Sequence, residues 1–411
     1  MDTLTIIYLI FTFLGFYYFF LFTLIYFQNK SKMFEWHKPK KEYSLSIVVP
    51  CFNEEKSIEQ TIKGILNSDY KGLKKLYVVD DCSTDKSYEI IKKCSLKYPQ
   101  VIALQTPKNT GCAAGAKNYG AKFVDTELIG FSDADSYSNP SAISKMIGFF
   151  NDEKVGAVTS RVLVQNRKKF LAKLQSIEYK LIAFTRKLFG FVESIYVTNG
   201  PLSIYRKKAF DQVKGFDESN WTEDIEITWH FVSKGWRIHI SLDTFVYTTV
   251  PEKFKAWIKQ RLRWNIGGIQ TIIKYRKLMF KCGMLGIFIL PYFFLAWVLG
   301  IGGLLLFIYR FARYLYINYL ATSYSIESQT AILRFNDIGF APSVLFFFGM
   351  VLLTLGIWYN LTALSHSKKE EGFKKEGLFS LLIYMFVYLL FYPVVLVASL
   401  NKFFKGNHTW R

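Results

Sequence analysis

Cysteine is scarce in this chain, and its spacing follows no metal-site pattern. Five cysteines occur in 411 residues, and none of them forms a CxxC pair. Zinc sites built from clustered cysteines are therefore not predicted. We expect the thiols to be reduced, in a domain that faces the cytoplasm.

Acidic residues are also in short supply. The chain has 32 Asp and Glu against 52 Lys and Arg, a formal net charge of +20. Nucleic-acid binding is one use of a basic balance. Lys and Arg also collect on the cytoplasmic flanks of membrane spans and against anionic headgroups. The second explanation is the simpler one here, so we expect membrane lipids as partners and no nucleic acid.

Apolar residues are abundant, and they are separated from the charges along the chain. The hydrophobic fraction is 51% and aromatics reach 18%, while charged residues still make up 20%. Residues 5–27 and most of 283–400 are apolar, whereas 28–281 hold most of the charge. This separation predicts one soluble domain framed by membrane segments.

Four apolar runs are long enough to cross a bilayer as helices, at 6–27, 283–309, 344–364 and 378–400. The first lacks the basic start and the small-residue cleavage site of a signal peptide, so it is predicted to be a permanent anchor. The lysines that follow it place the soluble domain in the cytoplasm, and the basic loop 368–375 fits a cytoplasmic hairpin. The side of the C-terminal tail stays open, because four spans put it outside while its basic residues favour the inside.

Strand and helix patterns alternate in the soluble part. Runs of apolar, mostly β-branched residues at 44–50, 76–79, 101–104 and 128–131 predict strands, with helical patterns between them. The alternation predicts a parallel sheet covered by helices on both faces. In such sheets ligands bind at the carboxyl ends of the strands.

Acidic pairs fall at two of these strand ends. Asp80 and Asp81 follow the second strand, where a carboxylate can accept a hydrogen bond from a base N–H or a ribose hydroxyl. Asp133 and Asp135 follow the fourth strand and offer two hard oxygen ligands. Mg²⁺ is usually held by one or two carboxylates plus substrate phosphates. Helix capping after Asp81 and a solvated polar turn at 133–135 are the alternatives, but the strand-end position favours a metal site at Asp133 and Asp135.

Glu223 and Asp224 are the candidate catalytic carboxylates, in the role of a general base. A sugar hydroxyl must lose its proton as it attacks an anomeric carbon, and a positioned carboxylate typically contributes 10²–10⁴-fold to such a step. Taken by itself, the segment 221–229 is an ordinary helix N-terminus in which Thr222 caps the helix and the acids favour its dipole.

Gln260, Arg263 and Trp264 share one helix face, because they lie at positions i, i+3 and i+4. Arg263 can meet a diphosphate, and Trp264 can stack against a sugar ring. The same stretch interleaves aromatic residues, including Trp257, with lysines and arginines. That pattern is typical of an amphipathic helix lying on lipid headgroups, and we expect both interpretations to apply.

Together these motifs resemble the inverting, processive-type family 2 glycosyltransferases, which include cellulose, chitin, hyaluronan and poly-N-acetylglucosamine synthases. The matching stretch runs from about residue 44 to 270. It holds the family's ordered acids, its QxxRW motif at 260–264, an opening PCFNEE segment at 50–55 and an acceptor-side segment at 198–206. Cys82 is a departure, since many members have Gly after the Asp pair.

The resemblance implies a GT-A-like, Rossmann-like domain and a set of roles. Asp81 would contact uracil, Asp135 would bind Mg²⁺ or Mn²⁺, and Asp224 would be the base. Arg263 and Trp264 would engage the pyrophosphate and the acceptor. The substrate-binding residues expected from motif and resemblance are Pro50, Glu54, Asp80, Asp81, Asp133, Lys117, Gly200, Gln260, Arg263 and Trp264.

The expected protein is an inverting β-glycosyltransferase in the plasma membrane that transfers a sugar from a UDP-sugar to a growing polysaccharide. N-acetylglucosamine is the expected sugar, because residues 222–270 resemble the poly-N-acetylglucosamine synthases most. A single-addition enzyme acting on a membrane lipid is the first alternative. A channel or transporter with a nucleotide-sensing domain is the second, although four spans are few for one and no intramembrane acid marks an ion path. The expected organisation is an anchor (1–29), a GT-A domain (42–249), amphipathic helices (250–282) and a C-terminal membrane region (283–411).

Overall fold

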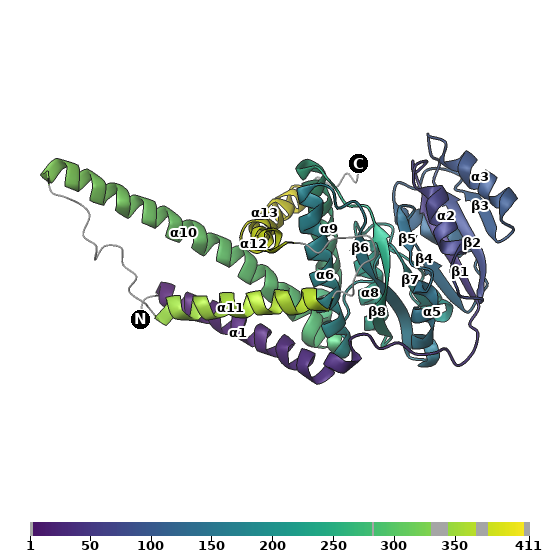
Figure 1. Ribbon diagram of the computed structural model, residues 1–411, viewed down its shortest axis with the longest axis horizontal. Helices are drawn as coiled ribbons and strands as arrows, with labels where there is room; N and C mark the ends of the chain where they lie inside the picture. The colour runs from purple at the N-terminus through teal and green to yellow at the C-terminus, as the bar shows by residue number, and fades with distance from the viewer. Residues whose placement is uncertain (1–2, 282, 330–343, 367–376, 407–411) are drawn as a thin grey trace.

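The computed structural model describes residues 3–281, 283–329, 344–366 and 377–406, and it joins an α/β domain to a set of long apolar helices (Figure 1). The basic loop 368–375 and the tail residues 407–411 lie outside the described residues, so the predictions made for them are not addressed further.

The α/β domain is built on an eight-stranded sheet of order β3-β2-β1-β4-β7-β6-β8-β5. Its strands are β1 (Leu45–Cys51), β2 (Leu73–Asp80), β3 (Val101–Gln105), β4 (Leu128–Phe131), β5 (Ser136–Ser138), β6 (Val155–Val164), β7 (Ser203–Arg206) and β8 (Arg237–Thr248). Strands β3, β2, β1 and β4 run parallel, whereas β7 is antiparallel to both of its neighbours. The predicted GT-A-like, mostly parallel sheet is thereby confirmed.

Helices cover both faces of the sheet and bury the strand side chains in two separate cores. Successive residues of a strand point to opposite faces. Val48 therefore packs into one core, while Ile47 and Val49 pack into the other, and all three are fully buried. The shorter helices of the domain are α2 (Ile58–Leu66), α3 (Ser87–Lys97), α4 (Ala113–Ala121), α5 (Ala142–Ile147), α7 (Lys207–Gln212) and α8 (Glu223–Ser233).

Two longer helices, α6 (Phe170–Phe191) and α9 (Phe254–Tyr275), lie between the sheet and the apolar helices (Figure 1). Helix α6 contacts β6 and β8 as well as the apolar helices α11 (Val344–Ser365) and α12 (Leu378–Phe386). Helix α9 contacts α8 of the α/β domain and also the apolar helix α13 (Phe391–Phe404). The α/β domain and the apolar helices therefore share α6 and α9 as a common interface.

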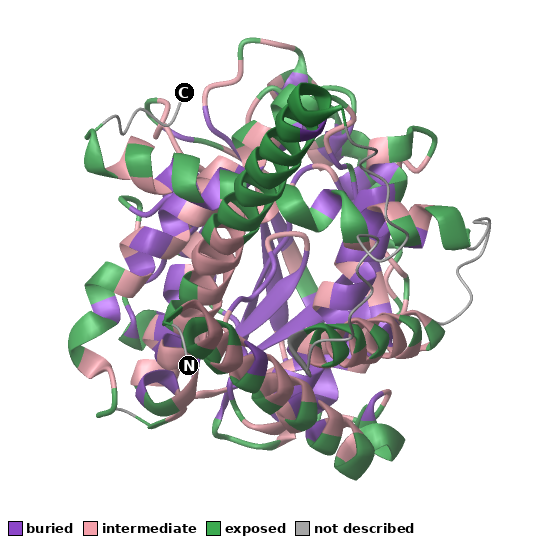
Figure 2. Ribbon diagram, turned by 90° about the vertical axis from the view of Figure 1, so that its left-hand side faces the viewer, coloured by how far each residue is buried: buried purple, intermediate pink, exposed green. Residues whose placement is uncertain are grey.

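Four helical segments are long and apolar enough to cross a membrane, as the sequence predicts: Thr3–Lys32, Leu285–Ser328, Phe346–Ser365 and Leu378–Phe404. The first contains α1 (Thr3–Asn29), and the second contains α10 (Leu290–Ser328), which continues well past the predicted end at residue 309. The fourth is interrupted by a 3₁₀ turn at Tyr388–Leu390 between α12 and α13. Figure 2 shows these helices end-on, mostly exposed or intermediate, with the buried strands behind them, as expected of surfaces that face lipid.

Candidate active site

A cavity of about 620 Å³ opens at the carboxyl ends of β1, β2 and β4. Its walls come from these strand ends, from α4 and α6, and from the segment before β7. The start of α8 and the middle of α9 complete them. The predicted site residues that line it are Pro50, Glu54, Asp81, Lys117, Asp133, Asp135, Gly200, Glu223, Asp224, Gln260, Arg263 and Trp264. Residues up to 214 positions apart in the chain thus meet around one hollow, because the parallel strands end at the same edge of the sheet.

Asp80 and Asp81 have different surroundings, although the sequence predicts that both bind substrate. Asp80 is not among the residues that line the cavity, and its Oδ2 accepts hydrogen bonds from the Ser83 amide (3.1 Å) and the Gln105 side chain (3.0 Å). These hydrogen bonds stabilise the turn after β2. Asp80 points away from the cavity because successive residues of a strand point to opposite faces, and the next residue, Asp81, lines the cavity. Asp81 does line the cavity.

The Asp81 carboxylate is held in one orientation by two threonines. Its Oδ1 accepts from the Thr106 hydroxyl and the Thr110 amide, both at 2.9 Å, and its Oδ2 accepts from the Thr110 hydroxyl at 3.0 Å. A carboxylate oxygen has about two acceptor positions, so acceptor capacity remains on Oδ2 for a donor in the cavity.

Cys82 adopts the left-handed conformation that glycine adopts most readily, with φ of 58°. The turn keeps this geometry with a cysteine in place of the family's glycine, and the Sγ of Cys82 lies 3.3 Å from the Thr106 carbonyl oxygen, to which it donates. Asn53, in the facing turn, is also left-handed (φ 57°), and its Oδ1 accepts from the Thr84 amide at 2.8 Å. The departure from the family pattern therefore leaves the turn intact.

Three acids line the cavity close enough for their charges to act on one another: Glu54, Asp133 and Asp135. Burial, followed by the charges of Asp133 and Glu54, raises the pKa of Asp135 to about 7. Such repulsion is relieved when a cation binds between the carboxylates. Among residues 3–281 and the other described ranges, no group of three or more His, Cys, Asp and Glu side chains is arranged to hold a metal by itself. The arrangement fits a cation whose remaining ligands are substrate phosphates.

Gly200 makes room for one of these acids. A Cβ at this position would lie 2.9 Å from Oδ1 of Asp133, closer than real Cβ atoms come to such neighbours. Any larger residue at position 200 would therefore force the Asp133 carboxylate to shift, because that carboxylate lies directly against the glycine backbone. This contact, rather than backbone flexibility, explains the glycine in the acceptor-side segment.

A buried lysine connects two parts of the site. Lys117 is 2% exposed, and its Nζ lies 2.8 Å from Oε1 of Glu223 and 3.6 Å from Oδ1 of Asp133. Burial acts to lower the pKa of Lys117, but the neighbouring acids outweigh it and hold that pKa above its ordinary value. Burial likewise acts to raise the pKa of Glu223, yet Lys117 and Arg263 keep it below its usual range. Lys117 and Glu223 are therefore both ionised and paired.

Of the two neighbouring acids Glu223 and Asp224, Asp224 is the one whose pKa is raised toward neutral pH. Burial, followed by the charge of Glu223, raises the pKa of Asp224 to about 6. It occupies the first turn of α8, and its Oδ1 accepts from the Ile225 amide at 2.9 Å. Its predicted helix N-terminus is observed, but Thr222 makes no side-chain capping bond and its hydroxyl donates to Oδ1 of Asn220 instead, at 3.3 Å.

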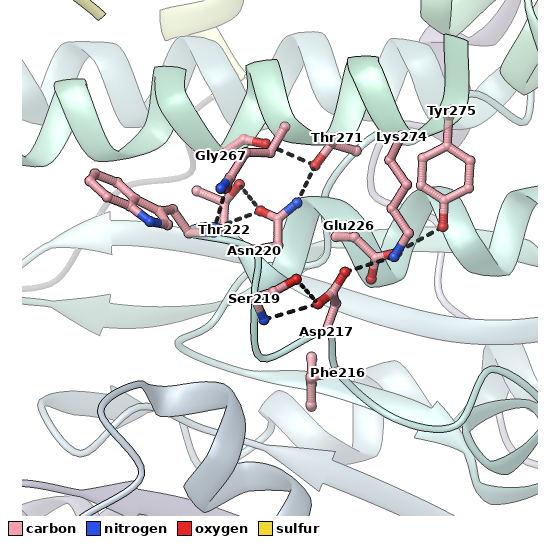
Figure 3. A network of polar contacts seen from close by, with 12 residues as sticks. Phe216, Asp217, Ser219, Asn220, Thr222, Glu226, Gly267, Thr271, Lys274 and Tyr275 are labelled. Carbon is pink, nitrogen blue, oxygen red and sulfur yellow. Dashed lines mark hydrogen bonds and ion pairs between the residues drawn. The ribbon is translucent and has the colours of Figure 1, made fainter. Parts of the chain in front are cut away.

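The start of α8 is fixed against α9 by close packing and by hydrogen bonds (Figure 3). A Cβ on Gly267 would lie 2.7 Å from the Cβ of Thr222, so the two segments touch at the glycine. Asn220 donates to the Thr271 hydroxyl at 3.0 Å. One turn further along, the Nζ of Lys274 lies 2.6 Å from Oε1 of Glu226. The helix that carries Gln260, Arg263 and Trp264 is thereby held in register with the segment that carries Glu223 and Asp224.

Arg261, which the sequence analysis did not single out, sits within the QxxRW motif and is buried. Its guanidinium lies 4.0 Å from the centroid of the Trp264 ring and donates to Oε1 of Gln260 at 2.8 Å. It also forms an ion pair with Glu178 of α6, at 2.6 Å. One face of the Trp264 ring is thus covered by Arg261. The prediction missed this pair because it depends on contact between distant helices.

The same network reaches the last apolar segment. Both Tyr388 and Tyr392 donate to the Glu178 carboxylate, the first at 2.6 Å. Trp257, predicted to lie on lipid headgroups, is 0% exposed and donates from Nε1 to the Tyr388 hydroxyl at 2.6 Å. At this position the aromatic residue of α9 therefore packs against the last apolar segment of the same chain, which covers the Trp257 ring in place of lipid.

The sequence analysis also missed one wall of the cavity. Tyr179, Ile182, Ala183 and Arg186 of α6 line it, together with Tyr196. The first four follow the spacing of one helix face, which is the signal that was available. Nothing in the sequence places that face against the strand ends.

Comparison with known proteins agrees with this geometry. Residues 42–267, more than half of the chain, match the profile of the family described as "Glycosyltransferase like family 2". The poly-beta-1,6-N-acetyl-D-glucosamine synthase of Staphylococcus aureus is 29% identical over 232 residues, which are 56% of this chain and 56% of that protein. This chain therefore matches little more than half the length of that relative. The synthase of the same name from Staphylococcus epidermidis is 26% identical over 373 residues, 89% of this chain and 86% of that protein.

A solved structure shares the fold over nearly the whole chain. It is the mannosyltransferase PcManGT of Pyrobaculum calidifontis, in complex with GDP-Man and Mn²⁺, with a TM-score of 0.63 and 17% identity over 98% of this chain and 100% of that one. At this identity the similarity establishes the fold. The family match, the fold and the related synthases together show that the chain belongs to the family 2 glycosyltransferases, with a GT-A-like domain joined to apolar helices that can span a membrane.

Proposed function

We propose that the protein is an inverting β-glycosyltransferase that transfers N-acetylglucosamine from UDP-N-acetylglucosamine to a growing polysaccharide. One observation carries the proposal: Asp81, Asp135, Asp224 and the Arg263–Trp264 pair line a single cavity of about 620 Å³. A hollow of this size suits a small-molecule ligand. The relatives named as poly-beta-1,6-N-acetyl-D-glucosamine synthases support the choice of sugar.

The donor would lie along the strand ends. The fixed carboxylate of Asp81 would accept the N–H of uracil, and Arg263 would neutralise the diphosphate. Asp135 and Asp133 would hold Mg²⁺ or Mn²⁺, which when bound supplies charge neutralisation for the leaving diphosphate. Burial, followed by the charges of Asp133 and Glu54, raises the pKa of Asp135 to about 7, and the repulsion among these carboxylates supports a cation at this place.

Asp224 would be the general base. The acceptor hydroxyl would attack the anomeric carbon from the side opposite the diphosphate, its proton would pass to the Asp224 carboxylate, and the bond to the diphosphate would break with inversion. Glu223 would act as a positioning residue, because its pairing with Lys117 at 2.8 Å keeps it ionised next to Asp224.

The apolar helices would hold the enzyme in the plasma membrane as a multi-pass protein, with residues 42–249 as the catalytic domain in the cytoplasm. The lysines after α1 support this orientation by the positive-inside rule. Residues 1–29 would be the anchor, 250–282 the helices that join the domain to the bilayer, and 283–411 the C-terminal membrane region, placed beside Trp264 where the product leaves.

The test is product analysis with purified enzyme in lipid nanodiscs, Mg²⁺ and one UDP-sugar at a time. We expect UDP release with UDP-N-acetylglucosamine, and mass spectrometry should show chains that grow by N-acetylhexosamine units. Turnover with UDP-glucose or UDP-galactose alone would overturn the choice of sugar, and a single glycolipid product would overturn polymer synthesis.

A matched pair of variants tests the base. Asp224→Asn should lower UDP release by about 10²–10⁴-fold while the protein stays folded. Asp211→Asn, an exposed acid on α7 that pairs with Lys207, is the control and should keep wild-type turnover. Normal UDP release by Asp224→Asn would remove Asp224 from the reaction.

A further inference from the structure

Arg186 is a buried cation on the cavity wall formed by α6. It is 7% exposed and lines the cavity together with Tyr196 and Asn199. Asn199 immediately precedes Gly200, on which the Asp133 carboxylate rests. The guanidinium therefore lies in the same hollow as the predicted catalytic acids, and the sequence analysis assigned it no role.

The positive charge of Arg186 has no acidic partner. Across the described parts of the chain, no carboxylate lies within 4.0 Å of it, and the hydrogen-bond acceptor it has is the neutral Oδ1 of Asn199. Its Nε is buried and has no hydrogen-bond partner. The Tyr196 ring, 5.7 Å from the guanidinium carbon, contributes only a weaker attraction.

The contrast with Arg261 shows what is missing. Arg261 is also buried, but its charge is matched by Glu178 at 2.6 Å. Buried charges in proteins are normally paired, because an unpaired one pays a large desolvation penalty. An unpaired cation that faces a ligand cavity therefore has the arrangement expected of a binding group whose partner arrives with the ligand.

We propose that Arg186 binds a phosphate oxygen of a ligand in this cavity, with Asn199 holding the guanidinium in place. An arginine that keeps unused donors can make charge-assisted hydrogen bonds to a phosphate, often in pairs. The proposal rests on the proposed function to the extent that the cavity is the sugar-transfer site. Two sources supply the same chemistry: the donor's diphosphate, and the phosphate of a lipid acceptor entering along α6, whose other side contacts α11 and α12.

Binding measurements with phosphate-bearing probes test this in full-length enzyme in phosphatidylcholine nanodiscs. The probes are UDP, farnesyl phosphate and, as the neutral match to the latter, farnesol. Arg186→Gln should weaken binding of a phosphate probe by roughly 10-fold or more, the effect of one charge-assisted hydrogen bond. Weaker UDP binding alone identifies the donor as the source, and loss of the preference for farnesyl phosphate over farnesol identifies a lipid phosphate.

Controls separate this role from a structural one. Arg237→Gln, which removes an exposed arginine paired with Asp152 and Glu193, should leave binding of all three probes unchanged. Arg186→Gln should melt at the same temperature as wild type or higher, because it removes an uncompensated buried charge. If Arg186→Gln does not fold, Arg186→Lys keeps the charge with fewer donors and should show the same selective weakening.

Two outcomes decide against the proposal. Unchanged affinity of the folded Arg186 variants for both UDP and farnesyl phosphate overturns it, as does equal weakening of farnesol and farnesyl phosphate binding with UDP binding intact. Failure of the proposed function is seen separately, because Asp224→Asn should lose UDP release and still bind the phosphate probes as wild type does.

Discussion

Asp224 combines burial with a nearby negative charge, and both effects raise its pKa to about 6. A base works only in its ionised form, so UDP release at saturating Mg²⁺ should fall about tenfold for each pH unit below that value. The measurement is the pH dependence of kcat/KM between pH 4.5 and 8. A rate that is flat down to pH 4.5 would show that another group accepts the proton.

The same pKa shift makes a prediction about stability. An unfolded Asp has a pKa of about 3.9, so between about 3.9 and 6 the unfolded chain releases this proton before the folded one does. Stability therefore falls as the pH rises through that window and stays lower above it. Asp224→Asn never ionises, so its melting temperature at pH 7 should equal or exceed that of wild type, as measured by thermal unfolding in detergent.

Substitution of Gly200 should affect the proposed metal site through its contact with Asp133. In Gly200→Ala the new methyl group would meet the Asp133 carboxylate, which must then move. Groups that orient metal ligands typically change metal affinity 10- to 100-fold when lost, so the concentration of Mn²⁺ needed for half-maximal UDP release should rise by about 10-fold. An unchanged Mn²⁺ requirement would show that Asp133 is not positioned by this glycine.

At the scale of elements, the contact between α8 and α9 rests on one glycine and has a matched control beside it. Gly267→Ala places a methyl group against Thr222 and should separate the two helices, lowering both the melting temperature and kcat. Gly268→Ala meets no heavy atom within 4 Å and should stabilise the helix by about 0.5–1 kcal/mol. Equal effects of the two substitutions would contradict a specific contact at 267.

The buried ion pair between α6 and α9 is open to a double-mutant cycle. Removing one partner leaves an uncompensated buried charge, so Glu178→Gln should destabilise the protein by about 3–5 kcal/mol. Arg261→Gln together with Glu178→Gln should cost much less than the sum of the two single changes, Arg261→Gln and Glu178→Gln, as thermal unfolding in nanodiscs would measure. Additive losses would show that the two side chains do not act as a pair.

Local patterns predicted the first half of the domain better than the second. Strands β1 to β4 each contain a short apolar run, so local composition marks them. Strands β5 to β8 were not predicted, because β6 pairs with both β7 and β8 over long sequence separations and their ends are set by that pairing. Trp257 illustrates the same limit, since only the fold reveals that Tyr388 covers it.

The candidate site shows a similar division. The convergence of Asp81, Asp135 and Asp224 on one cavity was predictable, because each residue follows or begins a regular element in a recognisable motif. Asp80 was predicted to bind substrate, but it does not line the cavity and its side chain accepts hydrogen bonds in the turn after β2, because neighbours in an extended segment point in opposite directions. Arg186 could not be predicted, since its significance lies in the acid that is missing near it and not in the residues beside it in sequence.

For the whole molecule, the proposed orientation predicts which surfaces a membrane-impermeant maleimide reaches in intact cells. Gln329→Cys, at the end of α10, should be labelled from outside, whereas Lys38→Cys, after α1, should be labelled only after permeabilisation. All five native cysteines lie between residues 51 and 282, so wild-type protein is the unlabelled background. Labelling of Lys38→Cys in intact cells would invert the topology.

The hydroxyls of Tyr388 and Tyr392, in the last apolar segment, donate to the Glu178 carboxylate, which also forms an ion pair with Arg261 of α9. A lipid-free fragment ending near residue 282 would leave Glu178 without these donors and open Trp257 to water. Shortened forms of the enzyme for crystallisation or industrial use should therefore keep the final apolar segment. A change in bilayer thickness or lateral tension that moves this segment should change the turnover rate.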